Sequence, residues 1–260
     1  MLLAVDIGNT AIKFGIFDLS HIIECVSSFS VSSKVTRSSD EYELIIRQLL
    51  SSRNLDGKID RAVISSVAPS ITNSVKKATS AVSGSVPFII GAGTRTGFKI
   101  KTEDPSELGA DIVSNAAAAL AMSDAPVVVA DLGTATTLTA INRDKEILGT
   151  IIVPGAGVSL DALSNSAELL SKVSVARPDN LIGTNTVDSI TSGVINGNIY
   201  MIDGFVRNLR EQLCVEGEKL SLIATGGMCE TIIPHCRNKF NIVKDLTLIG
   251  AAWLFKNNRR

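Results

Sequence analysis

Two short segments carry residue types that can hold nucleotide phosphates. The first is Asp6-Ile7-Gly8-Asn9-Thr10, followed by Ala11, Ile12 and Lys13, and the second is Asp131-Leu132-Gly133-Thr134-Ala135-Thr136-Thr137. Glycine permits unusual backbone angles and a close approach to a ligand, so the N–H groups that follow it can face a phosphate. The side chains of Asn9 and Thr10, or of Thr134 and Thr136, add donors. The two Asp carboxylates suit a cation or its waters, and Lys13 can reach a phosphate as a point charge.

Repetition separates this interpretation from an ordinary hairpin turn, in which Asp, Gly and Asn are also common. Each segment follows a short apolar strand, at residues 2–5 and 127–130, and each precedes a second segment with a β-like pattern. The two copies lie about one domain apart. The sequence therefore predicts a duplicated domain with the two turns facing each other across a cleft.

Strands and helices that alternate along both halves predict an α/β fold. The apolar pattern predicts helices over residues 39–51, 106–122, 158–170, 187–213 and 246–255, and strands over 61–67, 86–90, 147–153 and 220–224. Helix 106–122 has the clearest signals, because Pro105 precedes it and Glu107 lies in its first turn. We expect this helix to join the halves, with domains at residues 1–115 and 116–260.

Composition argues against several other classes of protein. A net charge of −1 gives no basic field, which disfavours nucleic acid as a principal ligand. The first ten residues suggest a strand rather than a signal peptide, and no apolar run approaches the roughly 18 residues of a spanning helix. Four scattered cysteines and two histidines favour reduced thiols over a zinc site. We expect a cytoplasmic protein without a membrane segment.

Further motifs give the chain a resemblance to one family. They are Asp104-Pro105-Ser106-Glu107-Leu108-Gly109-Ala110-Asp111, Val153-Pro154-Gly155, Gly183-Thr184-Asn185-Thr186, Ser192-Gly193 and Thr225-Gly226-Gly227. In this order, together with the two phosphate turns, they resemble the type III pantothenate kinases of the actin-like superfamily over nearly the whole chain. By itself, Thr225-Gly226-Gly227 is a turn where backbone could approach a flat ligand such as adenine.

The resemblance implies both a reaction and a set of site residues. It implies two actin-like (ribonuclease H-like) domains with a central cleft, and transfer of the ATP γ-phosphate to pantothenate, giving 4'-phosphopantothenate in the first step of coenzyme A biosynthesis. Asp111 would be the catalytic base, and Asp131 would hold a monovalent cation, potassium or ammonium, with magnesium bound to ATP. A homodimer is also implied. The ATP-binding positions would be Asp6, Ile7, Gly8, Asn9, Thr10, Ala11, Ile12, Lys13 and Thr134. The pantothenate-binding positions would be Gly109, Ala110, Asp111, Ile112 and Thr186.

The sequence departs from the family pattern most clearly at Ile112. The family carries Arg there, similar to a clamp for the pantothenate carboxylate. Such a contact is worth about 1.5 to 3 kcal/mol, so its loss is expected to cost roughly tenfold to a hundredfold in affinity. Smaller departures occur at Gly149-Thr150, where Gly-Gly is usual, and at Leu170, where Pro often follows Leu.

Three hypotheses follow from these departures. The first, which we prefer, is a pantothenate kinase in which another cation, Arg177 or Lys99, takes over the carboxylate. The second is a kinase of the same superfamily for another small alcohol that lacks an anionic group. The third is a non-catalytic nucleotide-binding regulator, against which the retention of Lys13, Asp111 and Asp131 argues.

Overall fold

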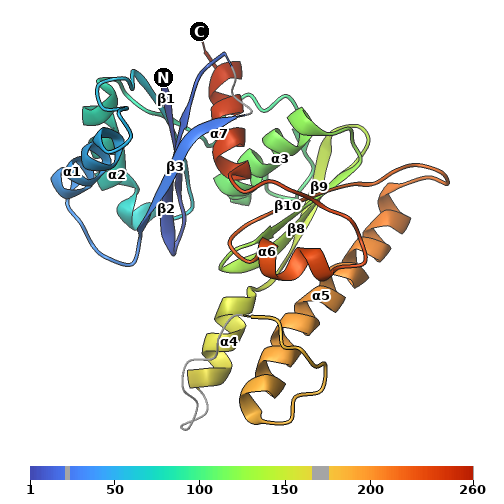
Figure 1. Ribbon diagram of the computed structural model, residues 1–260. Coiled ribbons are helices and arrows are strands. Elements are labelled where there is room, and N and C mark those ends of the chain that lie inside the picture. Colours follow the sequence, from blue (N-terminus) through green and yellow to red (C-terminus); the bar gives the residue numbers. More distant parts are fainter. Residues whose placement is uncertain (21–23, 166–175, 260) are drawn as a thin grey trace. The chain divides into compact units, whose positions relative to one another are not determined.

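The computed structural model describes residues 1–20, 24–165 and 176–259 (Figure 1). It is a mixed α/β protein, which confirms the predicted class. Two compact units divide it, Met1–Met122 with Asp245–Arg260, and Ser123–Lys244. The boundary expected between Asn115 and Ala116 falls inside a helix, and the closing helix belongs to the first unit. The two units of the structure therefore differ from the two consecutive domains that were expected.

The first unit is built on a sheet of strand order β3-β2-β1-β4-β5, in which β1 is antiparallel to β2 and parallel to β4. Helices α1 and α2 lie on one side of this sheet, and α7 lies on the other beside α3 (Figure 1). Its elements are β1 (Leu2–Ile7), β2 (Ala11–Phe17), β3 (Cys25–Ser32), α1 (Ser39–Ser51), β4 (Arg61–Ser66), α2 (Pro69–Ser83), β5 (Phe88–Ile89), β6 (Lys99–Ile100), the 3-10 turn η1 (Pro105–Glu107), α3 (Ala110–Met122) and α7 (Leu246–Asn257).

The second unit repeats this design. Its strand order is β11-β10-β7-β8-β9, which matches β5-β4-β1-β2-β3 of the first unit position by position. The burial patterns of β1 and β7 are identical residue by residue, as are those of β2 and β8. The duplication predicted from the two turns is confirmed. Its elements are β7 (Val127–Leu132), β8 (Ala135–Ile141), β9 (Glu146–Pro154), α4 (Ala156–Asn165), α5 (Thr186–Leu213), β10 (Ser221–Thr225), α6 (Cys229–Ile232), the 3-10 turn η2 (Ile233–His235) and β11 (Asn241–Ile242).

Local signals explain why several elements begin where they do. Ser38 and Glu41 form a capping box at the start of α1, in which each side chain accepts the backbone N–H of the other residue, and α1 matches the predicted 39–51. Helix α2, by contrast, was not predicted. Pro69 ended the predicted strand region, yet it occupies the first turn of α2, where its missing N–H costs nothing. Proline therefore marked a helix start as well as a strand end.

The helix predicted over 106–122 begins later than expected. Asp104 accepts hydrogen bonds from the backbone N–H and the hydroxyl of Ser106, at 2.8 and 2.6 Å, and so caps the short turn η1. Leu108 is then extended, and α3 starts at Ala110. The prediction of one continuous helix was wrong because this local cap competes with helix continuation.

The predicted helix over 158–170 corresponds to α4, and its end, with Leu170, lies outside the described residues.

Candidate active site

The first phosphate turn joins β1 to β2. Asp6 lies one residue before the end of β1, and in the antiparallel register it is directly opposite Lys13. The Gly8 N–H donates to the Ala11 carbonyl at 3.0 Å and closes the turn, with Asn9 and Thr10 exposed at its tip. Ile7 and Ile12 have no exposed surface, so these two of the predicted ATP-binding residues present neither side-chain nor backbone atoms to a ligand.

The second phosphate turn joins β7 to β8 and is one residue shorter. The Gly133 N–H donates to the Ala135 carbonyl at 3.1 Å, and Thr134 is exposed at the tip. The Thr136 side chain was expected to add a donor for phosphate. It is instead 1% exposed, because this position faces the core, as Ile12 does in the first turn. Thr137 lies opposite Asp131, in the position that Lys13 holds opposite Asp6.

The expected reason for glycine in these turns is only partly correct. Neither Gly8 nor Gly133 is among the glycines with positive φ. A Cβ on Gly8 would lie 3.1 Å from the Ala11 carbonyl oxygen, a tight contact, whereas at Gly133 the nearest atoms lie at an ordinary 3.6 Å. Close approach of the backbone therefore accounts for Gly8, and unusual backbone angles account for neither residue.

Two other glycines support the second turn from outside it. Gly155 donates its N–H to the Thr134 carbonyl at 3.0 Å, and an added Cβ would lie 2.5 Å from that same oxygen. Gly226 has a φ of 99°, and its Cβ would lie 2.5 Å from the Leu132 carbonyl carbon. Sequence reasoning named both motifs without recognising this role. The signal was the Gly residue directly after β9 and again after β10.

Asp111 lies in the first turn of α3 and is the last residue of the sequence motif that begins at Asp104. Its Oδ1 accepts the Ile112 N–H at 2.8 Å, and the side chain packs so closely on Gly109 that a Cβ there would collide with Oδ1. The carboxyl group is half-buried, and loss of hydration raises its pKa above the usual Asp value, partly offset by the hydrogen bond from the Ile112 N–H. A carboxylate with a raised pKa is a better proton acceptor.

A cavity of about 880 Å³ opens beside this helix start, within the range of small-molecule sites. All of its lining residues belong to the first unit. They include Gly109 and Ala110 of the predicted substrate motif, followed by Val113, but neither Asp111 nor Ile112. The other walls come from the end of β4, residues 90–100 and the turn η1. The structure thus brings part of the predicted pantothenate motif to a cavity of suitable size.

Thr186, the remaining predicted substrate residue, is the exposed first residue of α5 in the second unit. The loop before it is fixed to the helix: Asn185 accepts the Asp188 N–H at 2.9 Å, and Gly183 packs directly on the Ser189 backbone. Arg177, one of the two cations considered for the pantothenate carboxylate, bonds His235 at 3.0 Å in this same unit. Lys99, the other, is exposed and is not among the residues that line the 880 Å³ cavity.

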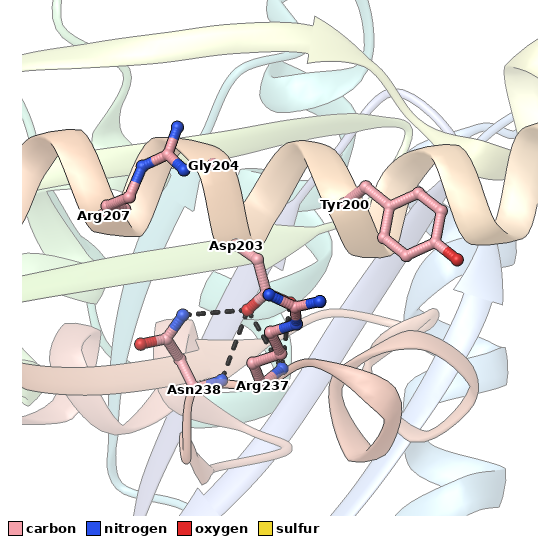
Figure 2. Close-up of a pocket in the computed structure, with 6 residues that line it drawn as sticks. All are labelled: Tyr200, Asp203, Gly204, Arg207, Arg237 and Asn238. Carbon is pink, nitrogen blue, oxygen red and sulfur yellow. Dashed lines mark hydrogen bonds between the residues drawn. The ribbon is translucent and has the colours of Figure 1, made fainter.

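A smaller pocket of about 380 Å³ lies between α5 and residues 237–238 (Figure 2). Asp203 accepts hydrogen bonds from the backbone N–H of Arg237, at 2.9 Å, and from the side-chain amide of Asn238, at 2.8 Å. The Asn238 backbone N–H adds a longer bond of 3.3 Å. These bonds attach the segment to the helix, so the acid has a structural role.

The donor set can be compared with what a metal ion would need. Among the described residues, no three His, Cys, Asp or Glu side chains form a group that could hold a metal by themselves. Mg²⁺ in phosphate-binding sites usually takes one or two carboxylates together with phosphate oxygens and water. Asp6 and Asp131, each one residue before the end of a buried strand in its own unit, are each a carboxylate that could serve such a site. Across the described part of the chain, no helix is both long and apolar enough to span a bilayer.

Two units whose own strands follow one order, each with an Asp-x-Gly turn between its first two strands, give this chain the fold of two actin-like domains. The crystal structure of a conserved protein described as a Baf family transcriptional activator from Campylobacter jejuni has a similar fold, with a TM-score of 0.60. It is 20% identical, over 98% of each chain. At that identity the likeness concerns the fold alone.

Sequence relatives define the family. A model of the type III pantothenate kinase family matches residues 2–208. The type III pantothenate kinases of Moorella thermoacetica and Shouchella clausii are 38% and 34% identical to this chain, with 99% and 100% of the chain and 100% of each relative covered. The chain belongs to the type III pantothenate kinase family. It is a kinase that uses ATP with a divalent metal to phosphorylate pantothenate in coenzyme A biosynthesis.

Proposed function

We propose that Asp111 is the general base that accepts the proton of the pantothenate primary hydroxyl. The observation that carries this role is its position at the start of α3, next to cavity-lining residues and with a pKa raised by burial. As the hydroxyl oxygen forms its bond to the γ-phosphorus, the bond to the ADP oxygen breaks, and the hydroxyl proton passes to the Asp111 carboxylate. Most of the acceleration comes from positioning and charge neutralisation.

The two turns supply that positioning in this proposal. The exposed tips at Asn9, Thr10 and Thr134 offer side-chain and backbone donors to the phosphates of ATP, and Lys13 adds a positive charge. Asp6 would hold the waters of the magnesium ion bound to ATP, and Asp131 a monovalent cation, potassium or ammonium. Both cations would neutralise charge that develops on the phosphates. Gly109, Ala110, Ile112 and Thr186 are proposed to contact pantothenate.

The homodimer implied by the family resemblance is also a proposal. Several large apolar side chains of the second unit are exposed on or beside α4 and α5, and such side chains favour a protein interface where they form one patch. They are Val158, Leu163, Leu181, Ile182, Val187 and Tyr200. Sedimentation equilibrium should give twice the mass of one chain, and a mass of 27.4 kDa at micromolar concentration would rule the dimer out.

The cytoplasmic location stays a prediction.

Turnover of pantothenate tests the catalytic proposal. Purified protein with ATP, magnesium and potassium should form phosphopantothenate, which mass spectrometry detects. Asp111→Asn should lower kcat by at least about a hundredfold, the usual scale for loss of a general base, while ATP binding persists. Asp40→Asn is a matched control, because Asp40 is also in the first turn of a helix but is exposed. Equal loss in both variants, or none in Asp111→Asn, would refute the assignment.

The same assay separates the alternatives raised by Ile112. If pantothenate were not turned over but another small alcohol was, the protein would be a kinase for a different acceptor. Binding of ATP without turnover of any acceptor would indicate a regulator. Replacing potassium by sodium should slow the reaction if Asp131 holds a selective monovalent site, and an unchanged rate would refute that site.

A further inference from the structure

Three polar side chains lie in one row across the sheet of the first unit. In the antiparallel pairing of β1 with β2, Asp6 is opposite Lys13, and in the parallel pairing of β1 with β4 it is opposite Ser65. Residues that pair directly across neighbouring strands project from the same face of a sheet. The Ser65 side chain therefore lies beside the carboxylate that is proposed to serve the magnesium ion of ATP.

This row is on the side of the sheet that faces α3 and α7. Ile7 and Ile64, which are the sequence neighbours of Asp6 and Ser65, belong to the apolar cluster that packs under α1 and α2. Because side chains alternate along a strand, Asp6 and Ser65 project from the opposite side, where α7 lies beside α3 (Figure 1). The proposed base, Asp111, is in the first turn of α3.

The Ser65 hydroxyl is buried without a hydrogen bond. The residue has no exposed surface, and its hydroxyl has no partner in the described part of the chain. A buried hydroxyl without a partner destabilises the folded state, because it has lost water and gained nothing in exchange. Folding therefore does not explain why this position holds serine, since alanine would lack only the unsatisfied oxygen.

The second unit shows a structural use of the same position. Thr225 is opposite Asp131 in the parallel pairing of β10 with β7, as Ser65 is opposite Asp6. Thr225 is also buried, but its hydroxyl donates to the Lys244 carbonyl at 3.3 Å. The duplicated fold thus places a buried hydroxyl beside each of the two carboxylates. In the first unit this structural bond is missing, so the hydroxyl remains available as a donor.

We propose that Ser65 is a positioning residue for Asp6 when the protein holds ATP and magnesium. Its hydroxyl donates to one oxygen of the Asp6 carboxylate and fixes the rotation of that group, so that the other oxygen can accept from the waters of the ion. A hydrogen bond to an ionised group is stronger than one between neutral groups. The inference rests on the proposed function, because Asp6 is the residue through which Ser65 acts.

Removal of the hydroxyl should affect the free and the ligand-bound protein differently. Without nucleotide, the Tm of Ser65→Ala should equal or exceed that of wild type, because an unsatisfied buried group is removed. The dissociation constant for ATP with magnesium, measured by calorimetry, should rise by about tenfold, the scale for partners that orient a metal-binding carboxylate. With EDTA in place of magnesium it should match wild type. An unchanged dissociation constant with magnesium, or a clear fall in Tm without nucleotide, would overturn the proposal.

Thr79→Val is the matched control. The Thr79 hydroxyl is also fully buried and has no partner among the described residues, but it belongs to α2, on the other side of the sheet (Figure 1). Valine has nearly the same shape and helix propensity as threonine, so this variant also removes only an unsatisfied hydroxyl. Its affinity for ATP with magnesium should match wild type. A loss of affinity as large as that of Ser65→Ala would indicate a general effect on the fold and overturn the proposal.

A double-mutant cycle shows whether Ser65 acts through Asp6. Asp6→Asn should weaken the binding of ATP with magnesium, and adding Ser65→Ala should cause little further loss, because the carboxylate that it orients is gone. Equal losses from Ser65→Ala in both backgrounds would refute the role through Asp6. A loss in Asp6→Asn with none in Ser65→Ala would overturn this inference alone. If Asp6→Asn changed neither binding nor kcat, the proposed role of Asp6 would itself fail.

Discussion

Gly155 offers a sharp test of how the second phosphate turn is held. The residue is buried directly after β9, and its N–H donates to the carbonyl of Thr134 at the tip of the turn. In Gly155→Ala the new methyl group would lie 2.5 Å from that oxygen and closer still to the Gly133 carbonyl oxygen. Because both neighbours are backbone atoms, no side-chain rotation can relieve the overlap.

The size of the effect follows from these distances. Ordinary contact begins near 3.4 Å, so the turn must move by about 1 Å. Overpacking of this kind costs about 1 to 3 kcal/mol of stability. At about 2 to 4 °C per kcal/mol for a protein near this size, Tm should fall by several degrees. A displacement of about 1 Å in a positioning group can also cost about a hundredfold in rate. We expect kcat/KM for ATP to fall on that scale.

Gly157→Ala is the matched control, two residues further along the chain. It adds the same methyl group in the first turn of α4, where no atom outside the local helix backbone lies within 4 Å. Since Ala favours a helix over Gly by about 1 kcal/mol, this variant should be as stable as wild type or more so. The assays are thermal denaturation and steady-state kinetics with ATP varied.

The combination of results decides whether the reasoning holds. A fall in both Tm and kcat/KM for ATP in Gly155→Ala alone supports it. If Gly155→Ala matched Gly157→Ala in both measurements, the contact with the Gly133-Thr134 backbone would not position the turn. A loss of stability with an unchanged KM and kcat for ATP would show that the turn moves without consequence for nucleotide.

Three further predictions concern Asp111 and Asp203. Burial raises the pKa of Asp111 above the usual value of 3.8. Because a base acts only when ionised, kcat/KM for pantothenate should fall as the pH is lowered through this raised pKa. A pH profile whose acid limb lies at or below 3.8 would contradict this. The same raised pKa means that ionised Asp111 costs stability only above the unfolded pKa, so Asp111→Asn should be no less stable than wild type at pH 7, as urea titration would show. Asp203→Ala removes an acceptor shared by Arg237 and Asn238, so it should lower the free energy of unfolding by about 1 to 3 kcal/mol in the same titration. The control Arg207→Ala, at an exposed position, should change it by no more than about 0.5 kcal/mol. Equal effects of the two variants would refute the role of Asp203 in attaching residues 237–238.

Much of the fold was predictable because its signals are local. Strand β1 and the start of β2 follow from apolar runs around a turn, and α1 follows from its apolar spacing and from Ser38 and Glu41. Helix α2 was missed because Ser and Thr are frequent in its sequence and its buried face, at Val75, Ala78, Thr79 and Val82, is made of small residues. The broken start of α3 was missed because it depends on the hydrogen bonds of Asp104.

The candidate site shows the same division. The order of motifs was sufficient to predict the family, now confirmed, and the residues of both turns. Burial then removed the Thr136 side chain as a donor and left Ile7 and Ile12 with no exposed surface. Such differences arise because a motif states which residues are adjacent, whereas the strand register states which face each side chain takes.

The sequence by itself determined the α/β class, the duplication and the phosphate chemistry, since a strand, an Asp-x-Gly turn and a second strand are specified by neighbouring residues. Only the tertiary structure decided what surrounds these segments. Gly155 and Gly226 pack against the second turn from other parts of the chain, and Phe98 and Ile100 line the 880 Å³ cavity while Lys99 is exposed. The physical reason is that close backbone contacts and the electrostatics of a cavity depend on which atoms share a space, and this is fixed only when the chain has packed.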